Sequence, residues 1–197
     1  MYLEKLKLHN FRCYEKLEID FNRQLTVLVG KNGSGKTTVL EAIAIALGTW
    51  FVGFNIVNAK GINKRTDPLR KAYQIGATDD VQTQFPVEIE AWGKIEESKD
   101  QILHWKRELY TPTGTMTTKD AKEIVEYAAE YQKAISEGRT DIYLPMVAYY
   151  GTGRLWDYHR QKRNDVFKVS SRTNGYIDCL DGTANVKLMM DLYNFYI

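Results

Sequence analysis

Gly30-Lys31-Asn32-Gly33-Ser34-Gly35-Lys36-Thr37 is the stretch that decides the fold, because it satisfies the pattern G-x-x-x-x-G-K-[ST]. Such a loop needs a strand before it and a helix after it. The apolar run 25–29 ends directly at the loop, as expected of a strand buried on both faces of a central sheet. The helix-forming stretch 36–47 follows, is apolar nearly all round, and meets a C-terminal cap at Gly48. The pattern predicts a phosphate-binding loop.

The residue types in the loop suit a nucleotide with magnesium. Glycines let consecutive N–H groups face a polyphosphate, and the positive end of the following helix favours its negative charge. Lys36 would place its charge on the β- and γ-phosphates, Thr37 would offer its hydroxyl to Mg²⁺, and Thr38 could bond the α-phosphate. The predicted cofactors are ATP and Mg²⁺. The loop residues expected to bind are Gly30, Asn32, Gly33, Ser34, Gly35, Lys36, Thr37 and Thr38, with Lys36 catalytic and Thr37 the metal ligand.

Composition sets limits on the class of protein. The 197 residues are 44% hydrophobic and 26% charged, which is typical of a folded globular chain. The formal charge of +2 gives no overall field that would favour nucleic acid or a membrane. Cys13 and Cys179 lack the spacing of a zinc or redox site. No apolar run is long enough to span a bilayer and no signal peptide is present, so we expect a cytoplasmic protein without a membrane partner.

The rest of the chain is interpreted as one domain over 1–197, and we expect it to be the N-terminal part of a longer protein. Period-two alternation around 6–8 and 17–21 predicts two antiparallel strands. Residues 53–84 show no sustained periodicity and are interpreted as a long flexible insertion. Range 87–138 is predicted to hold an antiparallel side sheet (87–92 and 102–109) and a surface helix with a Thr117 or Thr118 cap that ends at Gly138. A buried strand over 142–150 and a last helix from Ala184 follow.

Two sets of segments resemble known ATPases. Leu6-x-Leu8-x-Asn10-Phe11-Arg12, followed by the phosphate loop, resembles the opening of ABC-type ATPases of the RecF, Rad50 and SMC group. This resemblance implies an α/β P-loop NTPase fold, the ABC-ATPase-like N-terminal lobe with a mixed central sheet and an antiparallel side sheet. Segments 144–156 and 171–181 resemble a narrower bacterial family of predicted AAA/ABC ATP-binding proteins. Some relatives of that family act in anti-phage defence beside a nuclease.

The resemblance also implies roles for residues outside the loop. Arg12 would lie over the bound nucleotide and contact its base or phosphates. The group's glutamine loop is expected at 149–154, but the nearest following glutamine is Gln161, and Arg154 could instead reach the nucleotide or a facing subunit. No Ser-Gly-Gly signature loop and no apolar run ending in Asp-Glu is present. The intact protein is therefore expected to be an ATPase that forms an ATP-dependent homodimer, while this chain alone turns over weakly or not at all.

Three functions remain open at this stage. The first is an ATP-driven switch that acts on DNA or controls a partner nuclease, with the basic stretches 60–71 and 154–172 as candidate phosphate contacts. The second is a non-catalytic regulatory module that uses nucleotide as a structural ligand. The third is a P-loop kinase or GTPase, which the Asn10-Phe11-Arg12 opening, the side-sheet insertion and the lack of an Asn-Lys-x-Asp sequence disfavour.

Overall fold

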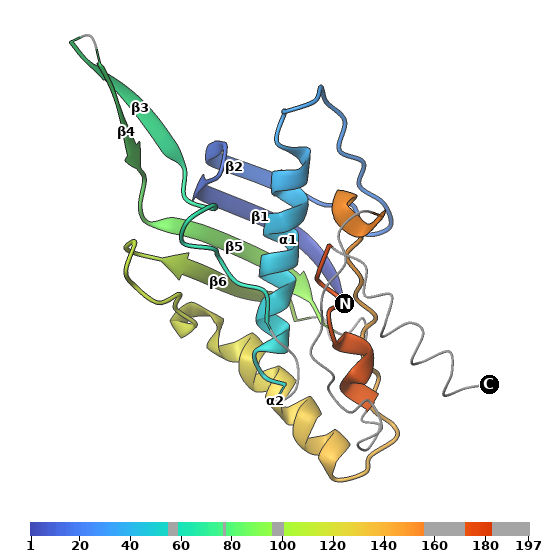
Figure 1. Ribbon diagram of the computed structural model, residues 1–197. Coiled ribbons are helices and arrows are strands. Elements are labelled where there is room, and N and C mark those ends of the chain that lie inside the picture. The colour runs from blue at the N-terminus through green and yellow to red at the C-terminus, as the bar shows by residue number, and fades with distance from the viewer. Residues whose placement is uncertain (55–58, 77, 96–100, 156–171, 183–197) are drawn as a thin grey trace.

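The computed structural model describes residues 1–54, 59–76, 78–95, 101–155 and 172–182 (Figure 1). Its larger sheet has four strands in the spatial order β2-β1-β5-β6, and each neighbouring pair is antiparallel. Apolar residues alternate with charged ones along these strands, so one side of the sheet faces the core and the other faces solvent. The strands are β1 (Tyr2–Phe11), β2 (Tyr14–Asp20), β5 (Val87–Lys94) and β6 (Leu103–Leu109).

Two helices, α1 (Lys36–Phe51) and α2 (Lys122–Ser136), cover the apolar side of the sheet (Figure 1). The indole N–H of Trp105 on β6 donates to the carbonyl of Ala46 on α1 at 2.9 Å, which ties the two layers together. None of the described helices is long and apolar enough to cross a membrane. The core between the layers includes the buried side chains of Leu6, Ile45, Trp50, Ile89, Trp105 and Ile124.

Several predicted elements are confirmed. The opening strands pair as β1 and β2, with Leu8 opposite Leu17. The strands predicted at 87–92 and 102–109 are β5 and β6, which extend the same sheet. On α2, Ile124, Ala128 and Tyr131 are buried at helical spacing. Neither Thr117 nor Thr118 caps this helix through its side chain, because a 3-10 turn at Lys119–Ala121 precedes it.

The predicted end of the first helix is wrong. The helix continues through Gly48 to Phe51, and Gly48 is buried. A Cβ atom built on Gly48 would lie 2.8 Å from the carbonyl oxygen of Lys60. The glycine therefore lets the segment around Lys60 pack directly on the helix, so it is a site of close packing rather than a cap.

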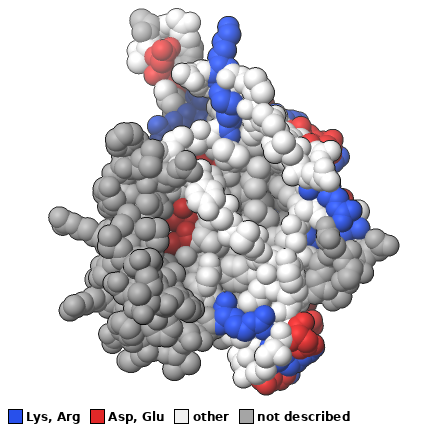
Figure 2. Space-filling model, turned by 90° about the vertical axis from the view of Figure 1, so that its right-hand side faces the viewer, with Lys and Arg blue, Asp and Glu red and all other residues white. Residues whose placement is uncertain are grey.

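The two predicted buried strands at 25–29 and 142–150 are also corrected. Neither segment forms a strand, and Leu25, Val29 and Met146 are 73%, 90% and 93% exposed. A strand with two apolar faces needs strand neighbours to bury both, and none of the described strands pairs with either segment. Both segments run along the right-hand side of Figure 1, and the middle of that face carries few charges in Figure 2.

Range 53–84 contains a hairpin that the sequence did not predict. Strands β3 (Arg70–Ile75) and β4 (Thr78–Thr83) form a two-stranded antiparallel sheet that projects from the body (Figure 1). Nearly all of its side chains are exposed, so it lacks the apolar alternation that would have revealed it. Turns follow at Thr152–Leu155 and Arg172–Tyr176. The helix predicted from Ala184 and most of the basic stretch 154–172, with Gln161 and the side chain of Arg154, lie outside the described residues.

Candidate functional site

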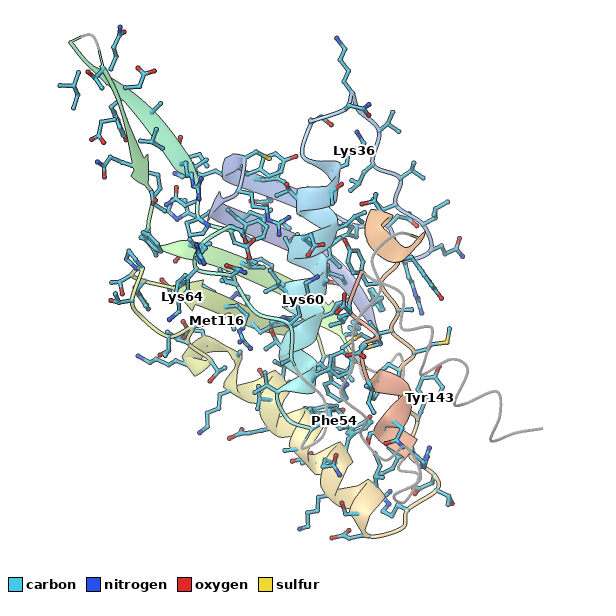
Figure 3. The ribbon with its side chains drawn as sticks, in the orientation of Figure 1. Lys36, Phe54, Lys60, Lys64, Met116 and Tyr143 are labelled. Atoms are coloured by element: carbon cyan, nitrogen blue, oxygen red, sulfur yellow. The ribbon has the colours of Figure 1, made fainter. Side chains whose placement is uncertain are left out.

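The predicted phosphate loop stands at the N-terminal end of α1 (Figure 3). The Lys36 ammonium folds back over the loop and donates to the carbonyls of Gly30 at 2.8 Å and Lys31 at 2.7 Å. A phosphate oxygen would offer it a charged acceptor in their place. The first turn of α1 contains no acidic residue and has no side-chain cap. Its N–H groups and the positive end of the helix dipole are therefore available to an anion.

The turn between β1 and β2 is docked on this loop. The Tyr14 hydroxyl donates to the carbonyl of Ser34 at 3.0 Å, and the Cys13 thiol donates to the hydroxyl of Thr38 at 3.7 Å. Gly35, the N-cap residue immediately before α1, has φ +86° and lies beneath both side chains. A Cβ there would lie 2.7 Å from Tyr14 Cζ and 2.9 Å from Cys13 Sγ. Only glycine fits both the left-handed backbone and the tight contact at this point.

The hydroxyl groups after Lys36 point to different surroundings. The side chain of Thr37 is exposed on the first turn, as a ligand of a nucleotide-bound Mg²⁺ must be. Thr38 is 9% exposed and lies against Cys13, which the sequence did not indicate. No group of three or more His, Cys, Asp or Glu side chains in the described part of the chain could hold a metal ion. Thr37 thus stays the predicted protein ligand of a nucleotide-bound Mg²⁺.

Arg12 lies in the docked turn and in the left-handed region at φ 51°. Its Nε donates to Oδ1 of Asp67 at 2.8 Å. The side chain of Arg12 is 30% exposed, whereas that of Asp67 is 2% exposed. The structure thus brings Arg12 to the phosphate loop through its neighbours Cys13 and Tyr14, and it adds a buried acid that the sequence did not single out.

A polar cluster behind the loop joins α1 to two distant segments. Glu41, one helical turn after Thr37, accepts from Lys60 at 2.6 Å and from the Tyr149 hydroxyl at 2.8 Å. Burial alone would raise the pKa of Glu41, but the hydrogen bonds from Lys60 and Tyr149 outweigh it and hold the pKa below its ordinary value. Burial and the bond to Glu41 raise the pKa of Tyr149. Glu41 is thus a paired carboxylate whose two oxygens are both engaged.

The basic stretch 60–71 is not a set of unpaired charges. Lys60 is bound to Glu41, and Lys71 forms a 2.8 Å ion pair with Glu15 on β2. Lys64 lies on the other side of the segment, where its ammonium donates to the carbonyl of Thr113 (Figure 3). Two of the five cations are therefore neutralised by acids, which weakens the sequence argument that this stretch tracks a phosphate backbone.

Sequence reasoning missed the residues that hold the loop in place. Tyr14, Asp67 and Tyr149 contact partners that lie 20, 55 and 108 residues away along the chain. No local periodicity or spacing could identify such pairs. Only the unusual Asp67-Pro68 dipeptide, which breaks regular structure, offered a signal that the backbone turns there.

Comparison with known proteins places these features in a wider group. The profile of a family described as AAA domain matches residues 5–194. The chain is 51% identical over 43 residues to the DNA replication and repair protein RecF of Clostridium acetobutylicum, a match covering 22% of this chain and 12% of that protein.

Two further relatives match a similar length. The DNA double-strand break repair Rad50 ATPase of Methanopyrus kandleri is 53% identical over 45 residues, covering 23% of this chain and 5% of that protein. Structural maintenance of chromosomes protein 6 of Saccharomyces cerevisiae is 47% identical over 47 residues, covering 24% of this chain and 4% of that protein. The matches thus span 12% or less of these relatives.

Proposed function

The chain belongs to the AAA domain family, and from that premise we propose that it is the ATP- and Mg²⁺-binding part of an ATPase related to RecF and Rad50. The observation that carries this proposal is the phosphate loop at the start of α1, with the turn of Arg12 docked on it. Relatives match this chain over similar lengths, and one of them is named an ATPase.

Each loop residue has a physical task in this proposal. The backbone N–H groups of 30–38 surround the phosphates, and Lys36 leaves the carbonyls of Gly30 and Lys31 to bind the β- and γ-phosphates. Thr37 ligates Mg²⁺, which neutralises charge on the phosphates when bound. Arg12, whose half-buried side chain belongs to the turn docked on the loop, contacts the nucleotide from above. Together they hold and orient ATP.

A pair of matched variants tests the metal assignment. A fluorescent ATP analogue is titrated into wild type, Thr37→Val and Thr38→Val, with and without Mg²⁺. Of these two threonines Thr37 alone exposes its side chain. In Thr37→Val the factor by which Mg²⁺ increases the affinity for ATP should therefore fall at least about tenfold. Thr38→Val should keep that gain, since the Thr38 hydroxyl faces Cys13. Equal behaviour of the two variants would contradict the assignment of Thr37.

We also propose that this site is one half of a composite site. Segments 25–29 and 142–150 expose apolar side chains, which suits contact with a further part of the intact protein or with a second copy. In the intact protein, ATP would bridge two copies, so that binding drives association and hydrolysis releases it. Light scattering of the whole polypeptide should then show dimers with ATP and Mg²⁺ and monomers without nucleotide. An unchanged mass with ATP would contradict this switch.

The biological output is a separate proposal. The relatives named for DNA replication and repair and for double-strand break repair support a role on DNA. The cytoplasmic location is proposed from the sequence alone. The resemblance of 144–156 and 171–181 to bacterial defence ATPases supports control of a partner nuclease. Because Lys60 and Lys71 are paired, DNA affinity is not expected from the 60–71 stretch alone. Absence of DNA binding by the intact protein at low salt would contradict the proposed role on DNA.

One observation favours a second candidate, a regulatory module that binds nucleotide without cleaving it. Glu41, the acid one turn after Thr37, is engaged by Lys60 and Tyr149 and is thus a poor base or metal ligand. Phosphate release by the intact protein that disappears in Lys36→Ala separates the ATPase from this module. Binding without release would favour the module.

A further inference from the structure

Asp67 is a buried carboxylate in the segment between α1 and the β3–β4 hairpin, and its bonds run to the turn that carries Arg12. Its Oδ1 accepts from Arg12 Nε at 2.8 Å and from the Thr66 hydroxyl at 3.3 Å. Its Oδ2 accepts from the backbone N–H of Asn63 at 2.7 Å. Its own carbonyl accepts from the backbone N–H of Arg12 at 2.6 Å. Asp67 thus holds Arg12 by main chain and side chain together.

The neighbours of Asp67 fix the same turn. The N–H of Leu69 donates to the carbonyl of Asn10 at 2.8 Å, and Pro68 lies opposite Phe11 in an isolated antiparallel bridge. Asn10 and Arg12 adopt φ values of 50° and 51°. Such left-handed backbone is unfavourable for residues other than glycine and persists only where surrounding contacts enforce it. The segment around Asp67 supplies those contacts.

The bond to Asp67 leaves the outer edge of the Arg12 guanidinium for another partner. Nε is used by the carboxylate, and within the described part of the chain neither terminal nitrogen of Arg12 donates to another residue. The next two residues, Cys13 and Tyr14, touch Thr38 and Ser34 of the phosphate loop. The turn that carries Arg12 is therefore docked on the loop, and the buried carboxylate fixes the guanidinium at Nε while the donors of the terminal nitrogens are left for another acceptor.

We propose that Asp67 is a positioning residue of the nucleotide site, which holds Arg12 by its Nε so that the terminal nitrogens meet ATP. This inference rests on the proposed function, in which Arg12 contacts the nucleotide. It assigns to the 59–69 segment a part in nucleotide binding, although the sequence suggested only a flexible insertion there. The residue acts through Arg12 and does not touch the nucleotide itself.

Asp67→Asn is a sharp probe because it keeps the volume of the side chain. Both Asp67 oxygens face N–H donors, one on Arg12 and one on Asn63. An amide can accept at only one of these positions and must turn its own N–H₂ toward a donor at the other. The substitution therefore removes the charge that holds the guanidinium and leaves one N–H donor, on Arg12 or on Asn63, facing another donor.

The experiment measures Mg²⁺-ATP affinity by calorimetry for wild type, Asp67→Asn, Arg12→Ala and the double variant. Asp67→Asn should weaken binding about tenfold, in line with the loss of a charge-assisted hydrogen bond. In the Arg12→Ala background it should cause no further loss, because the residue acts only through Arg12. Asp79→Asn, an exposed aspartate on β4, is the matched control and should bind like wild type.

Two results would overturn the inference. Wild-type affinity in Asp67→Asn would show that the carboxylate does not matter, and an equal loss in both backgrounds would show a merely structural role. If Asp67→Asn does not fold, the Mg²⁺-ATP affinity of Arg12→Lys tests the inference in its place. A single ammonium cannot serve the carboxylate and the nucleotide at once, so Arg12→Lys should lose as much affinity as Arg12→Ala. Wild-type affinity in Arg12→Lys would refute the inference.

The same data separate this inference from the proposed function. If wild type does not bind Mg²⁺-ATP, or if Lys36→Ala binds equally well, the proposed function itself fails. If wild type binds and Lys36→Ala does not, but neither Asp67→Asn nor Arg12→Lys changes the affinity, only the role of Asp67 fails.

Discussion

Gly35→Ala should destabilise the protein far more than Gly33→Ala, although both glycines lie in the same loop with similar backbone. Gly33 has φ +81° and Gly35 has φ +86°, so both substitutions carry the cost of left-handed alanine. The surroundings differ, because a Cβ on Gly33 meets nothing within 4 Å. A Cβ on Gly35 collides with the Tyr14 hydroxyl and lies 2.7 Å from Tyr14 Cζ.

The magnitude follows from these two contributions. Left-handed backbone costs about 1–2 kcal/mol for alanine, and this cost applies to both variants. Overpacking against Tyr14 and Cys13 adds about 1–3 kcal/mol for Gly35→Ala alone. The free energy of unfolding should therefore fall by about 2–5 kcal/mol in Gly35→Ala and by about 1–2 kcal/mol in Gly33→Ala.

Urea denaturation followed by tryptophan fluorescence measures both losses, since Trp50 and Trp105 are buried in the core. A double-mutant cycle between Gly35→Ala and Tyr14→Ala should show a coupling of about 1–2 kcal/mol, because removing the ring relieves the clash. Equal losses in the two glycine variants, or additive effects in the cycle, would refute the docking of the β1–β2 turn on the loop.

Three further predictions follow from the described contacts. Glu41→Gln should lower the free energy of unfolding at neutral pH. Because the pKa of Glu41 is depressed in the folded protein, the carboxylate stabilises the fold above its ordinary pKa of 4.5, and this stabilisation fades as the pH falls below that value. The denaturation curves of the two proteins should therefore converge in acid. At pH 8 iodoacetamide should modify the exposed Cys13 well before Cys179, because burial raises the pKa of the Cys179 thiol to about 11. Mg²⁺-ATP should slow the modification of Cys13. Mass spectrometry that found Cys179 modified first would contradict this expectation. Arg107→Met should keep or raise stability by up to about 3 kcal/mol, since Arg107 is 3% exposed and its Nε and Nη1 have no hydrogen-bond partner among the described residues. A clear loss in urea denaturation would contradict this expectation.

The local features of the fold could be predicted from the sequence. The phosphate loop, the helix from Lys36 and the β1–β2 strands depend on spacings of a few residues, which a single sequence displays directly. The amphipathic spacing of Ile124 and Ala128 likewise predicted α2. The α/β P-loop class follows from these elements, and the AAA domain match supports it.

The remaining features depend on contacts that span long stretches of sequence. Gly48 resembled a helix cap because its close approach to Lys60 is invisible in the sequence. The run 25–29 has the composition of a buried strand, but burial requires neighbouring strands, which local composition cannot supply. Asp67 sits in a stretch without periodicity, and its pairing with Arg12 across 55 residues emerges only in three dimensions.

The most direct test of the account is calorimetric titration of Mg²⁺-ATP into wild type, Lys36→Ala and Lys31→Ala. Lys36 folds over the loop and is assigned to the phosphates, whereas the exposed side chain of Lys31 has no assigned part in binding, so Lys31→Ala keeps the loop backbone and serves as the matched control. Wild type and Lys31→Ala should bind with similar affinity, and Lys36→Ala should show no measurable heat of binding. Undiminished affinity in Lys36→Ala would contradict the claim that residues 30–38 bind ATP.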